Sequence, residues 1–260
     1  MKAIHTVSLI AAAITLFVIS VPVQASKMDE QIVSSAQKSY VFKTYLKDDD
    51  IKIQSKDSVV TLTGTVSEEG HKQLARETVA SLPGVKSVDN KLELKGEVPA
   101  EHSDAWLMTK VKTSLLFHRS VSAIATEIDV KDGVVTLRGD TANQAQKDLT
   151  TEYVKDIDGV KEVKNEMTVA KTPKKPEEKT MGKKMSDIGE KIDDASITAL
   201  VKSTLMYHRT TSGLNTKVET NNGVVTLSGK AKNNAEKDLA TKFVSDVHGV
   251  KKVVNKMTAQ

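Results

Sequence analysis

The sequence has 260 residues, of which 38% are hydrophobic, 28% charged and 3% aromatic. This composition is too apolar for a disordered chain and too polar for an integral membrane protein, and so few rings favour several small cores over one large core. The chain contains no cysteine, which excludes disulfides, zinc–thiolate and iron–sulfur sites, cysteine nucleophiles and an acylated N-terminal cysteine. Length alone allows one large domain or two to three small ones.

The first 25 residues have the pattern of a secretory signal peptide. Lys2 supplies a positive charge, and residues 7–21 form an apolar run that is shorter than the roughly 20 residues of a membrane-spanning helix. Small residues then precede the expected cleavage point after Ala25. We therefore expect an exported, periplasmic mature chain without a lipid anchor. A retained membrane anchor is the alternative.

The rest of the chain contains three copies of one unit. Each copy has a turn-and-strand motif followed 26 residues later by a Gly-Val motif, and an asparagine lies six residues beyond that glycine. The first motif reads DSVVTLTG, DGVVTLRG and NGVVTLSG, and the asparagines are Asn90, Asn165 and Asn255. Chance does not give the same spacing three times. We therefore predict repeat 1 at 26–98, repeat 2 at 99–172, a basic linker at 173–190 and repeat 3 at 191–260.

The order of elements within a repeat follows from the apolar spacing. In repeat 2 the apolar residues Leu107, Val111 and Leu115 share one helical face. The elements expected after this helix are a strand at 128–130, a strand at 134–137 that ends at a glycine, a helix at 149–157 and a strand at 160–163. The sequence therefore predicts an α+β fold of three tandem αββαβ units, each with two helices on one face of a three-stranded mixed sheet.

Five glycines are predicted to be structural turn residues. Asp-Gly and Asn-Gly pairs favour tight hairpins, and a glycine after a helix favours a left-handed cap. A phosphate-binding loop is the alternative for the hairpin glycines, but no Gly-Lys-Ser/Thr sequence follows them. The glycines are Gly84, Gly133, Gly159, Gly223 and Gly249.

Repeat 1 and the repeated asparagines give two further predictions. In repeat 1 Ser58 replaces the hairpin glycine and the apolar residues Ile51 and Ile53 come earlier, so a longer loop at 54–58 without positive φ is expected. The asparagines are expected to bond nearby backbone rather than a ligand.

These motifs together resemble the BON domain family, named for bacterial osmotically inducible and nodulation proteins. The Gly-Val-Val-Thr-Leu-x-Gly run, the helix and the Gly-Val-x-x-Val-x-Asn run carry the resemblance, which covers nearly the whole mature chain. It implies a periplasmic, stress-associated protein that interacts with phospholipid surfaces or envelope proteins. It does not imply catalysis.

The sequence gives no sign of an active site. None of the six histidines forms a pair with metal-ligand spacing, and no Gly-x-Ser-x-Gly motif occurs. We therefore expect no enzyme, no cofactor and no metal. His118-Arg119 and His208-Arg209 occupy matching positions in repeats 2 and 3. They are expected either to end the first helix as cations or to contact anionic head groups.

The single tryptophan, Trp106, lies at the start of the first helix of repeat 2. A helical wheel places it opposite Val111, on one side with Lys110 and Phe117. An outward tryptophan beside a lysine is typical of a contact with a membrane interface. In the alternative interpretation, Trp106 folds back over its own repeat or packs between repeats, and the aromatic at position 117 is structural.

The linker between repeats 2 and 3 carries the excess positive charge. Residues 171–184 contain six lysines and two glutamates, a net charge of +4, whereas the whole chain has +4. The candidate lipid-binding lysines are Lys174, Lys175, Lys179, Lys183 and Lys184. A solvated, proline-extended spacer is the alternative.

Two functions remain open from the sequence. The first is a non-enzymatic envelope protein of osmotic stress that binds anionic phospholipid weakly and peripherally, through helix-one residues and the linker. The helix-one candidates are Trp106, Lys110, Phe117, Arg119 and Arg209. The second is a protein-binding module or holdase-like chaperone for envelope proteins, which would use an exposed sheet edge. Nucleic acid is excluded as a partner because export and the lack of stacking platforms argue against it. The sequence does not indicate an oligomeric state.

Overall fold

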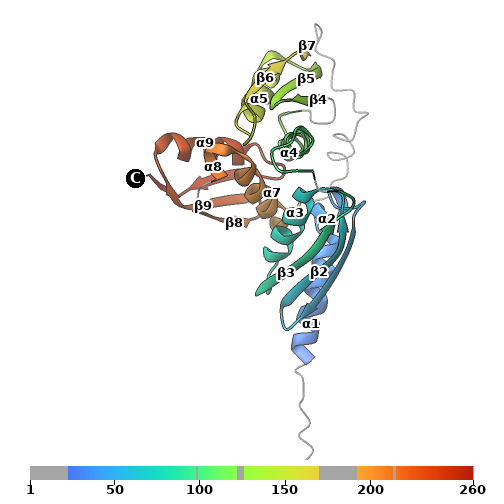
Figure 1. The fold of residues 1–260 in the computed structure, drawn as a ribbon. Coiled ribbons are helices and arrows are strands. Elements are labelled where there is room, and N and C mark those ends of the chain that lie inside the picture. Colours follow the sequence, from blue (N-terminus) through green and yellow to red (C-terminus); the bar gives the residue numbers. More distant parts are fainter. Residues whose placement is uncertain (1–22, 98, 122–125, 170–191, 213–214, 260) are drawn as a thin grey trace, which may run out of the picture.

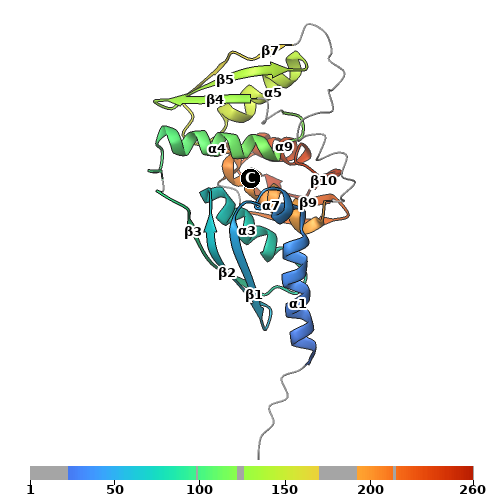
Figure 2. The same cartoon turned by 90° about the vertical axis from the view of Figure 1, so that its right-hand side faces the viewer.

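A computed structural model describes residues 23–97, 99–121, 126–169, 192–212 and 215–259. It contains three αββαβ repeats, each with its helices against one face of a sheet, and helix α7 lies at the centre where the repeats meet (Figures 1 and 2). The α+β fold predicted from the sequence is confirmed.

Repeat 1 contains an additional short helix beside its first helix. Its elements are α1 (Val23–Lys38), α2 (Tyr40–Thr44), β1 (Asp50–Lys56), β2 (Val59–Val66), α3 (Glu69–Ala80) and β3 (Ser87–Leu94). The predicted cleavage point after Ala25 lies in the first turn of α1.

Repeats 2 and 3 share the same order of strands and long helices, and repeat 3 has the additional short helix α8 after its first helix. Repeat 2 contains α4 (Asp104–Phe117), β4 (Thr126–Lys131), β5 (Val134–Thr141), α5 (Gln144–Lys155), β6 (Glu162–Asn165) and β7 (Thr168–Val169). Repeat 3 contains α7 (Asp194–Tyr207), α8 (Arg209–Ser212), β8 (Asn215–Asn221), β9 (Val224–Ala231), α9 (Asn234–Ser245), β10 (Lys252–Asn255) and β11 (Thr258–Ala259).

The central strand of each sheet has an antiparallel neighbour on one side and a parallel neighbour on the other. In repeats 2 and 3 the parallel strand is split into two short pieces that pair with the same central strand. The repeated asparagine lies at the break: Asn165 Oδ1 accepts the N–H of Met167 at 3.0 Å, and its Nδ2 donates to the Lys147 carbonyl at 3.0 Å. Asn90 makes the same two bonds in repeat 1, where β3 is continuous. The local backbone role predicted for this asparagine is confirmed.

The hairpin of repeat 1 differs from its prediction. Asp57 and Ser58 form a two-residue turn with φ of 54° and 68°, and Lys56 pairs with Val59. The predicted longer loop at 54–58 is therefore wrong. Ile53 lies opposite Leu62 just as Ile128 lies opposite Leu137, so the register is unchanged and only the apolar positions along the first strand differ.

An aspartate near the start of the first helix holds each hairpin turn. Asp29 Oδ1 accepts the N–H of Ser58 at 2.9 Å and its Oδ2 that of Asp57 at 3.0 Å. Asp104 and Asp194 bind the two turn N–H groups of their own repeats in the same way. Hydrogen bonds from Ser55 and Ser58 lower the pKa of Asp29. These bonds compensate the positive φ of Ser58, which lacks the conformational freedom of glycine.

A glycine bends the central strand of each repeat rather than ending it. Gly64 has φ of +116°, and β2 continues beyond it to Val66. A Cβ atom on Gly64 would lie 1.9 Å from the Asp50 carbonyl oxygen on β1. Gly139 and Gly229 occupy the same position in β5 and β9. The five predicted turn glycines also have positive φ; they are Gly84, Gly133, Gly159, Gly223 and Gly249.

Repeats 1 and 3 share one core, whereas repeat 2 has a core of its own that also takes in Phe243 of repeat 3. One continuous buried cluster contains core residues of repeats 1 and 3 and includes Phe117 of repeat 2. Helix α7 is buried over most of its surface, because it packs on α3, α4 and α9 as well as on its own sheet. A helix that is apolar around its whole circumference is stable only inside a protein, so α7 requires the other repeats.

Aromatic rings gather where the repeats meet. Tyr45 of repeat 1 lies edge-on to Phe117 of repeat 2 with ring centroids 5.7 Å apart, and Phe117 stacks on Tyr207 of repeat 3 at 6.0 Å. Tyr40 extends this aromatic cluster at 6.0 Å from Tyr45. Four of the rings, Tyr40, Tyr45, Phe117 and Tyr207, thus join the repeats.

Repeats 2 and 3 meet through a pseudo-symmetric junction. The end of α4 lies beside the end of α9, with His118 bridged to Val247, and the end of α7 lies beside the end of α5, with His208 bridged to Ile157. Both pairs are related by an offset of 90 residues, so each repeat offers the same surface to the other. Such self-complementary packing is the geometry of a twofold dimer.

Candidate binding site

Three of the five predicted lipid contacts within the described residues lie where the repeats pack: Phe117, Arg119 and Arg209. Phe117 is 1% exposed and lies between Tyr45 and Tyr207. Its predicted lipid contact is wrong, because the side of α4 that a helical wheel places away from the core of repeat 2 packs on repeats 1 and 3. Its alternative interpretation as a structural aromatic is correct.

Arg119 and Arg209 belong to the junction between repeats 2 and 3. The Arg119 guanidinium donates to the carbonyls of Val250 at 2.9 Å and Ser245 at 2.7 Å. These carbonyls lie near the end of α9, where a cation also suits the helix dipole. Arg209 has an exposed side chain, and its backbone N–H donates to the Asp156 carbonyl at 2.6 Å. Both residues thus contribute to the junction between repeats 2 and 3, so a contact with lipid is not their only role.

His118 and His208 are buried rather than exposed at a helix end. They are 1% and 0% exposed, and burial lowers the pKa of both rings. Their predicted place at the end of the first helix is confirmed, whereas the predicted contact with head groups is wrong because both rings are buried. The helices end at these residues with extended backbone, which turns each ring into the junction.

Trp106 folds back over its own repeat. Its ring contacts His102 edge-on at 5.2 Å between centroids and lies against Gly159, in the turn after α5. Lys110 Nζ lies 4.4 Å from the Trp106 ring centroid and 3.6 Å from Asp158 Oδ2. Burial lowers the pKa of Lys110, and Asp158 opposes this shift. The predicted outward tryptophan and lysine are thus partly buried and already paired.

Trp106 and Lys110 line a cleft of about 520 Å³ that is built by all three repeats. Repeat 1 contributes the start of α3 and the segment after β3, repeat 2 one face of α4, and repeat 3 the end of α7. The apolar lining residues are Leu94, Pro99, Trp106, Met206 and Tyr207, and the acidic ones are Glu68, Glu69, Glu97 and Glu101. We call this site the three-repeat cleft.

The glutamates and the tyrosine of the three-repeat cleft also take part in the packing of the repeats. Glu68 Oε2 accepts a hydrogen bond from Thr113 Oγ1 at 2.8 Å, which joins repeat 1 to repeat 2. A Cβ atom at Gly70 would lie 2.2 Å from the Tyr207 hydroxyl, so only glycine lets the ring reach α3. Burial, together with Glu68 and Glu69, raises the pKa of Tyr207. The cleft therefore combines an apolar floor with a predominantly acidic rim.

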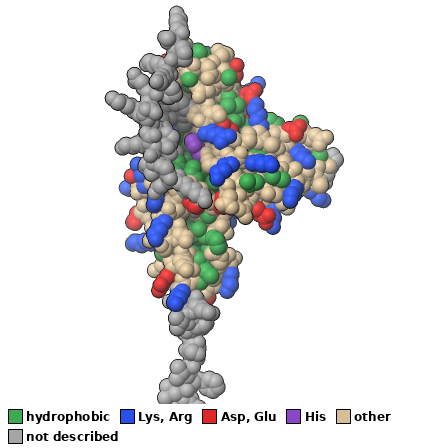
Figure 3. All heavy atoms as spheres, turned by 180° about the vertical axis from the view of Figure 1, so that it is seen from behind, with side chains coloured by type: hydrophobic (Ala, Val, Ile, Leu, Met, Phe, Trp, Pro, Cys, Tyr) green, Lys and Arg blue, Asp and Glu red, His purple; other side chains and the backbone are tan. Residues whose placement is uncertain are grey.

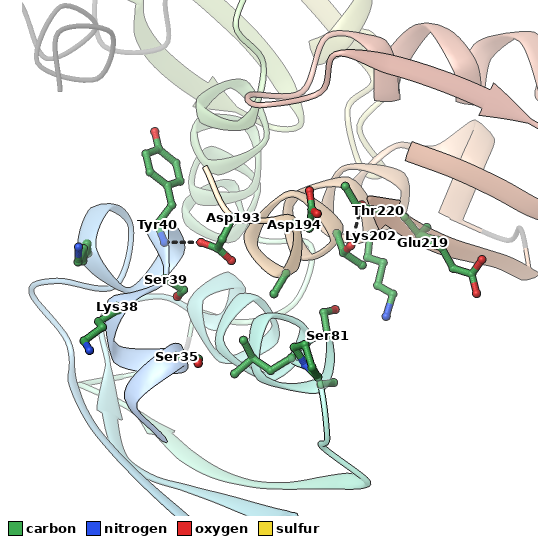
Figure 4. Close-up of a pocket in the computed structure, with 17 residues that line it drawn as sticks. Ser35, Lys38, Ser39, Tyr40, Ser81, Asp193, Asp194, Lys202, Glu219 and Thr220 are labelled. Atoms are coloured by element: carbon green, nitrogen blue, oxygen red, sulfur yellow. Dashed lines mark hydrogen bonds between the residues drawn. The ribbon is translucent and has the colours of Figure 1, made fainter. Parts of the chain in front are cut away.

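A larger cavity of about 790 Å³ lies between repeats 1 and 3 (Figure 4). Its polar groups bond to one another: Asp193 Oδ2 accepts the Tyr40 N–H at 2.8 Å, and Lys202 Nζ lies 2.9 Å from Glu77 Oε2. Thr198 Oγ1 donates to Thr220 Oγ1 at 2.7 Å. The Tyr40–Asp193 and Lys202–Glu77 contacts join repeats 1 and 3, so we interpret this cavity as a structural seam.

The remaining predictions on partners concern the linker lysines and the exposed sheet edge. All five candidate linker lysines, from Lys174 to Lys184, lie outside the described residues. The described residues contain no group of three or more His, Asp or Glu placed to hold a metal ion, and no helix among them is long and apolar enough to cross a membrane. The edge strand β1 exposes Lys52 and Lys56, as edges protected against strand addition do.

A sequence model described as the BON domain matches three segments of the chain: residues 28–96, 103–171 and 193–260. The chain belongs to the BON domain family. Each BON match spans one αββαβ repeat, and together they cover most of the sequence.

Relatives add context to this assignment. The chain is 31% identical over 143 residues to "Osmotically-inducible protein Y" of Escherichia coli (strain K12), an alignment that covers 54% of this chain and 71% of the relative. A solved structure of CdsD, a structural protein of the type III secretion system of Chlamydia trachomatis, is 15% identical with a TM-score of 0.23 and coverage of 88% and 92%. A TM-score this low does not establish a shared overall arrangement.

Sequence reasoning missed most of the three-repeat cleft. It singled out Trp106 and Lys110, but not Met206, Tyr207 or the glutamates of repeat 1. No local signal marks them, because the residues come together only when the three BON repeats pack.

Proposed function

We propose that this chain is a non-enzymatic binding protein of the osmotic-stress response in the cell envelope. Its BON repeats support an envelope role, and its similarity to an osmotically inducible protein of Escherichia coli supports the link to osmotic stress. A cleaved leader that ends at Ala25 and a periplasmic location belong to the same proposal.

The partner that the three-repeat cleft fits best is a cationic, amphipathic segment of an envelope protein. The observation that carries this proposal is the acidic rim, with four glutamates against two lysines, around a floor of Trp106, Met206 and Tyr207. An apolar side chain would fill the floor while flanking lysines or arginines meet the rim. Anionic head groups would be repelled by the same glutamates, so the cleft does not suit anionic phospholipid.

Titration with the peptide Lys-Lys-Leu-Lys-Lys is expected to shift the emission of Trp106, the single tryptophan of the chain. The double variant Glu97→Gln/Glu101→Gln should weaken binding about two- to thirtyfold, because each of the two exposed charge pairs contributes about 0.2–1 kcal/mol. The measurement is the dissociation constant from tryptophan fluorescence at low salt, where surface charges are least screened.

A matched control removes two exposed glutamates elsewhere in repeat 2, in the variant Glu127→Gln/Glu162→Gln. This control should bind the peptide as the unmodified chain does. An unchanged Trp106 emission, or equal weakening by both double variants, would contradict a site in the cleft.

Anionic phospholipid is the second candidate partner, and the linker charge favours it. The net charge of +4 over residues 171–184 can contribute up to about 1 kcal/mol per lysine at an anionic surface. The face in Figure 3 carries side chains of both signs, interspersed with hydrophobic ones, so this view of the folded repeats offers no comparable basic field.

Neutralising the linker should abolish most sedimentation with phosphatidylserine-containing vesicles at low salt. The variant replaces Lys174, Lys175, Lys179, Lys183 and Lys184 with glutamine, and the loss should exceed about tenfold. The control replaces five exposed lysines of the sheets, which are Lys52, Lys56, Lys131, Lys164 and Lys252. If both variants lose binding equally, net charge alone explains the association and the linker has no special role.

A further inference from the structure

Two histidines face each other in the middle of the junction between repeats 2 and 3. His118 Nε2 lies 3.3 Å from His208 Nε2, and both side chains are fully buried. Each Nδ1 lies 3.5 Å from a carboxylate oxygen of the opposite repeat: His118 faces Asp246, and His208 faces Asp156. The result is a row of four titratable groups, Asp–His–His–Asp, which crosses the junction.

The rest of the surroundings is mostly apolar or already bonded. The His118 ring stacks on Tyr153 at 4.0 Å between centroids, and the His208 ring stacks on Phe243 at 3.9 Å. Tyr153 also donates its hydroxyl to Asp246 Oδ2 at 2.9 Å. The burial of these rings leaves no room for water to solvate a charge on either imidazole.

Other charged groups act on the row from both repeats. Arg119 Nε lies 3.7 Å from Asp246 Oδ1, and Ser120 donates to the same oxygen. Thr210 Oγ1 donates to Asp156 Oδ2 at 2.6 Å. His248 and the opposite histidine disfavour a positive charge on His118, whereas Asp246 favours it. Burial alone would raise the pKa of both carboxylates, but the adjacent histidine and hydroxyl groups lower it. The two Nδ1 atoms approach the carboxylates at 3.5 Å without a well-formed hydrogen bond.

The placement of protons in this row is constrained. If both Nδ1 atoms carry a proton toward their carboxylates, the two Nε2 lone pairs face each other at 3.3 Å. If one ring instead carries its single proton on Nε2 and donates it to the other ring, its own Nδ1 has no proton. The lone pair of that Nδ1 then faces a carboxylate oxygen. One added proton, shared between the Nε2 atoms, satisfies every contact. A second added proton places two N–H donors and two buried positive charges against each other.

We propose that His118 and His208 form a proton-operated latch, which joins repeats 2 and 3 while the pair is neutral or shares one proton and releases them when both rings are protonated. The latch is separate from the three-repeat cleft. Because α7 belongs to both the junction and the cleft, release also alters the cleft that repeat 3 helps to build.

The direction of the pH effect follows from burial. Burial lowers the pKa of both rings below the ordinary value of 6.5. Above that value the closed and open forms bind equal numbers of protons, and the junction has its full stability. As the pH falls below 6.5 the open form takes up protons first, so the junction weakens until the pH passes below the pKa of the closed form.

Proximity labels across the junction test the latch in the full chain. Glu152 on α5 and Lys242 on α9 are exposed and form an ion pair at 2.5 Å. The chain has no cysteine, so the variant Glu152→Cys/Lys242→Cys accepts two pyrene labels at these positions only. We expect excimer emission at about pH 7.5 and its several-fold loss by about pH 5. Excimer emission that persists unchanged at about pH 5 would overturn the proposal.

Histidine variants of the labelled chain show which histidines cause the loss of excimer emission at low pH. His118→Gln/His208→Gln should remove most of the pH dependence of the excimer emission, and the remainder belongs to His248, whose pKa burial also lowers. His71→Gln in repeat 1, where His71 bonds Asp49 at 2.6 Å, should leave the loss unchanged. If the double variant shows no excimer emission at about pH 7.5, NMR titration of the unsubstituted histidines decides. Ring signals of His118 and His208 that titrate together with the excimer loss support the latch, and signals that titrate without it overturn the latch.

Discussion

Gly64→Ala is expected to destabilise the chain by about 4 kcal/mol, which is exceptional for the addition of one methyl group. The added Cβ would lie 1.9 Å from the Asp50 carbonyl oxygen, and alanine rarely adopts the φ of +116° found at this position. The neighbouring strand cannot retreat without losing the pairing of Ile51 with Gly64. Urea unfolding followed by circular dichroism would measure the loss.

Gly96→Ala is a matched control for backbone strain. Gly96 has φ of +99°, but no atom lies within 4 Å of a Cβ built there. Its substitution should therefore cost only about 1 kcal/mol, the cost of the left-handed backbone alone. Equal losses in the two variants would show that the close approach of β1 and β2 does not limit position 64.

Phe117→Ala is expected to cost about 3–5 kcal/mol of unfolding free energy, the usual range for a buried phenylalanine. The ring joins Tyr45 of repeat 1 to Tyr207 of repeat 3, so its loss should also separate the thermal unfolding into more than one transition. Differential scanning calorimetry would show both effects.

Met108→Ala on the same helix provides the comparison. Met108 is 37% exposed, so its truncation should change stability by about 0.5 kcal/mol or less. If Phe117 instead faced a membrane, its alanine variant would lose vesicle binding and keep its stability. That pattern would contradict the aromatic cluster described above.

The repeats and their elements could be predicted because their signals are local. Apolar spacing such as Leu107, Val111 and Leu115 identifies the face of α4 that covers its own sheet. Asp132-Gly133 identifies a hairpin without knowledge of any other part of the chain. Each of these signals depends on residues that are close in sequence, so it can be recognised without the tertiary structure.

The packing of the repeats could not be predicted, because helical periodicity reports one buried face and α4 has two. Thr113 and Phe117 look outward on a wheel centred on Val111, yet both are buried against other repeats. For α7 a signal was available: Ile197, Leu200 and their neighbours make the helix apolar around its circumference, which indicates an internal helix.

The hairpin of repeat 1 shows a different limit. Apolar residues Ile51 and Ile53 suggested an altered register, whereas the turn kept its geometry with Ser58 at positive φ. The compensating bonds come from Asp29, more than 20 residues earlier in the chain. A turn that is held by a distant side chain cannot be identified from the turn sequence alone.

The pseudo-symmetric junction has a consequence for how repeats 2 and 3 vary. Two separate proteins with such an interface would dissociate on dilution, whereas domains of one chain meet at a constant effective concentration. Identical subunits must also carry each substitution twice. Within one chain the two halves diverge independently: Tyr153 donates its hydroxyl to Asp246, and Phe243, its counterpart in repeat 3, has no hydroxyl to offer Asp156. Because repeats 2 and 3 belong to one chain, the two halves of their pseudo-twofold interface can differ in chemistry.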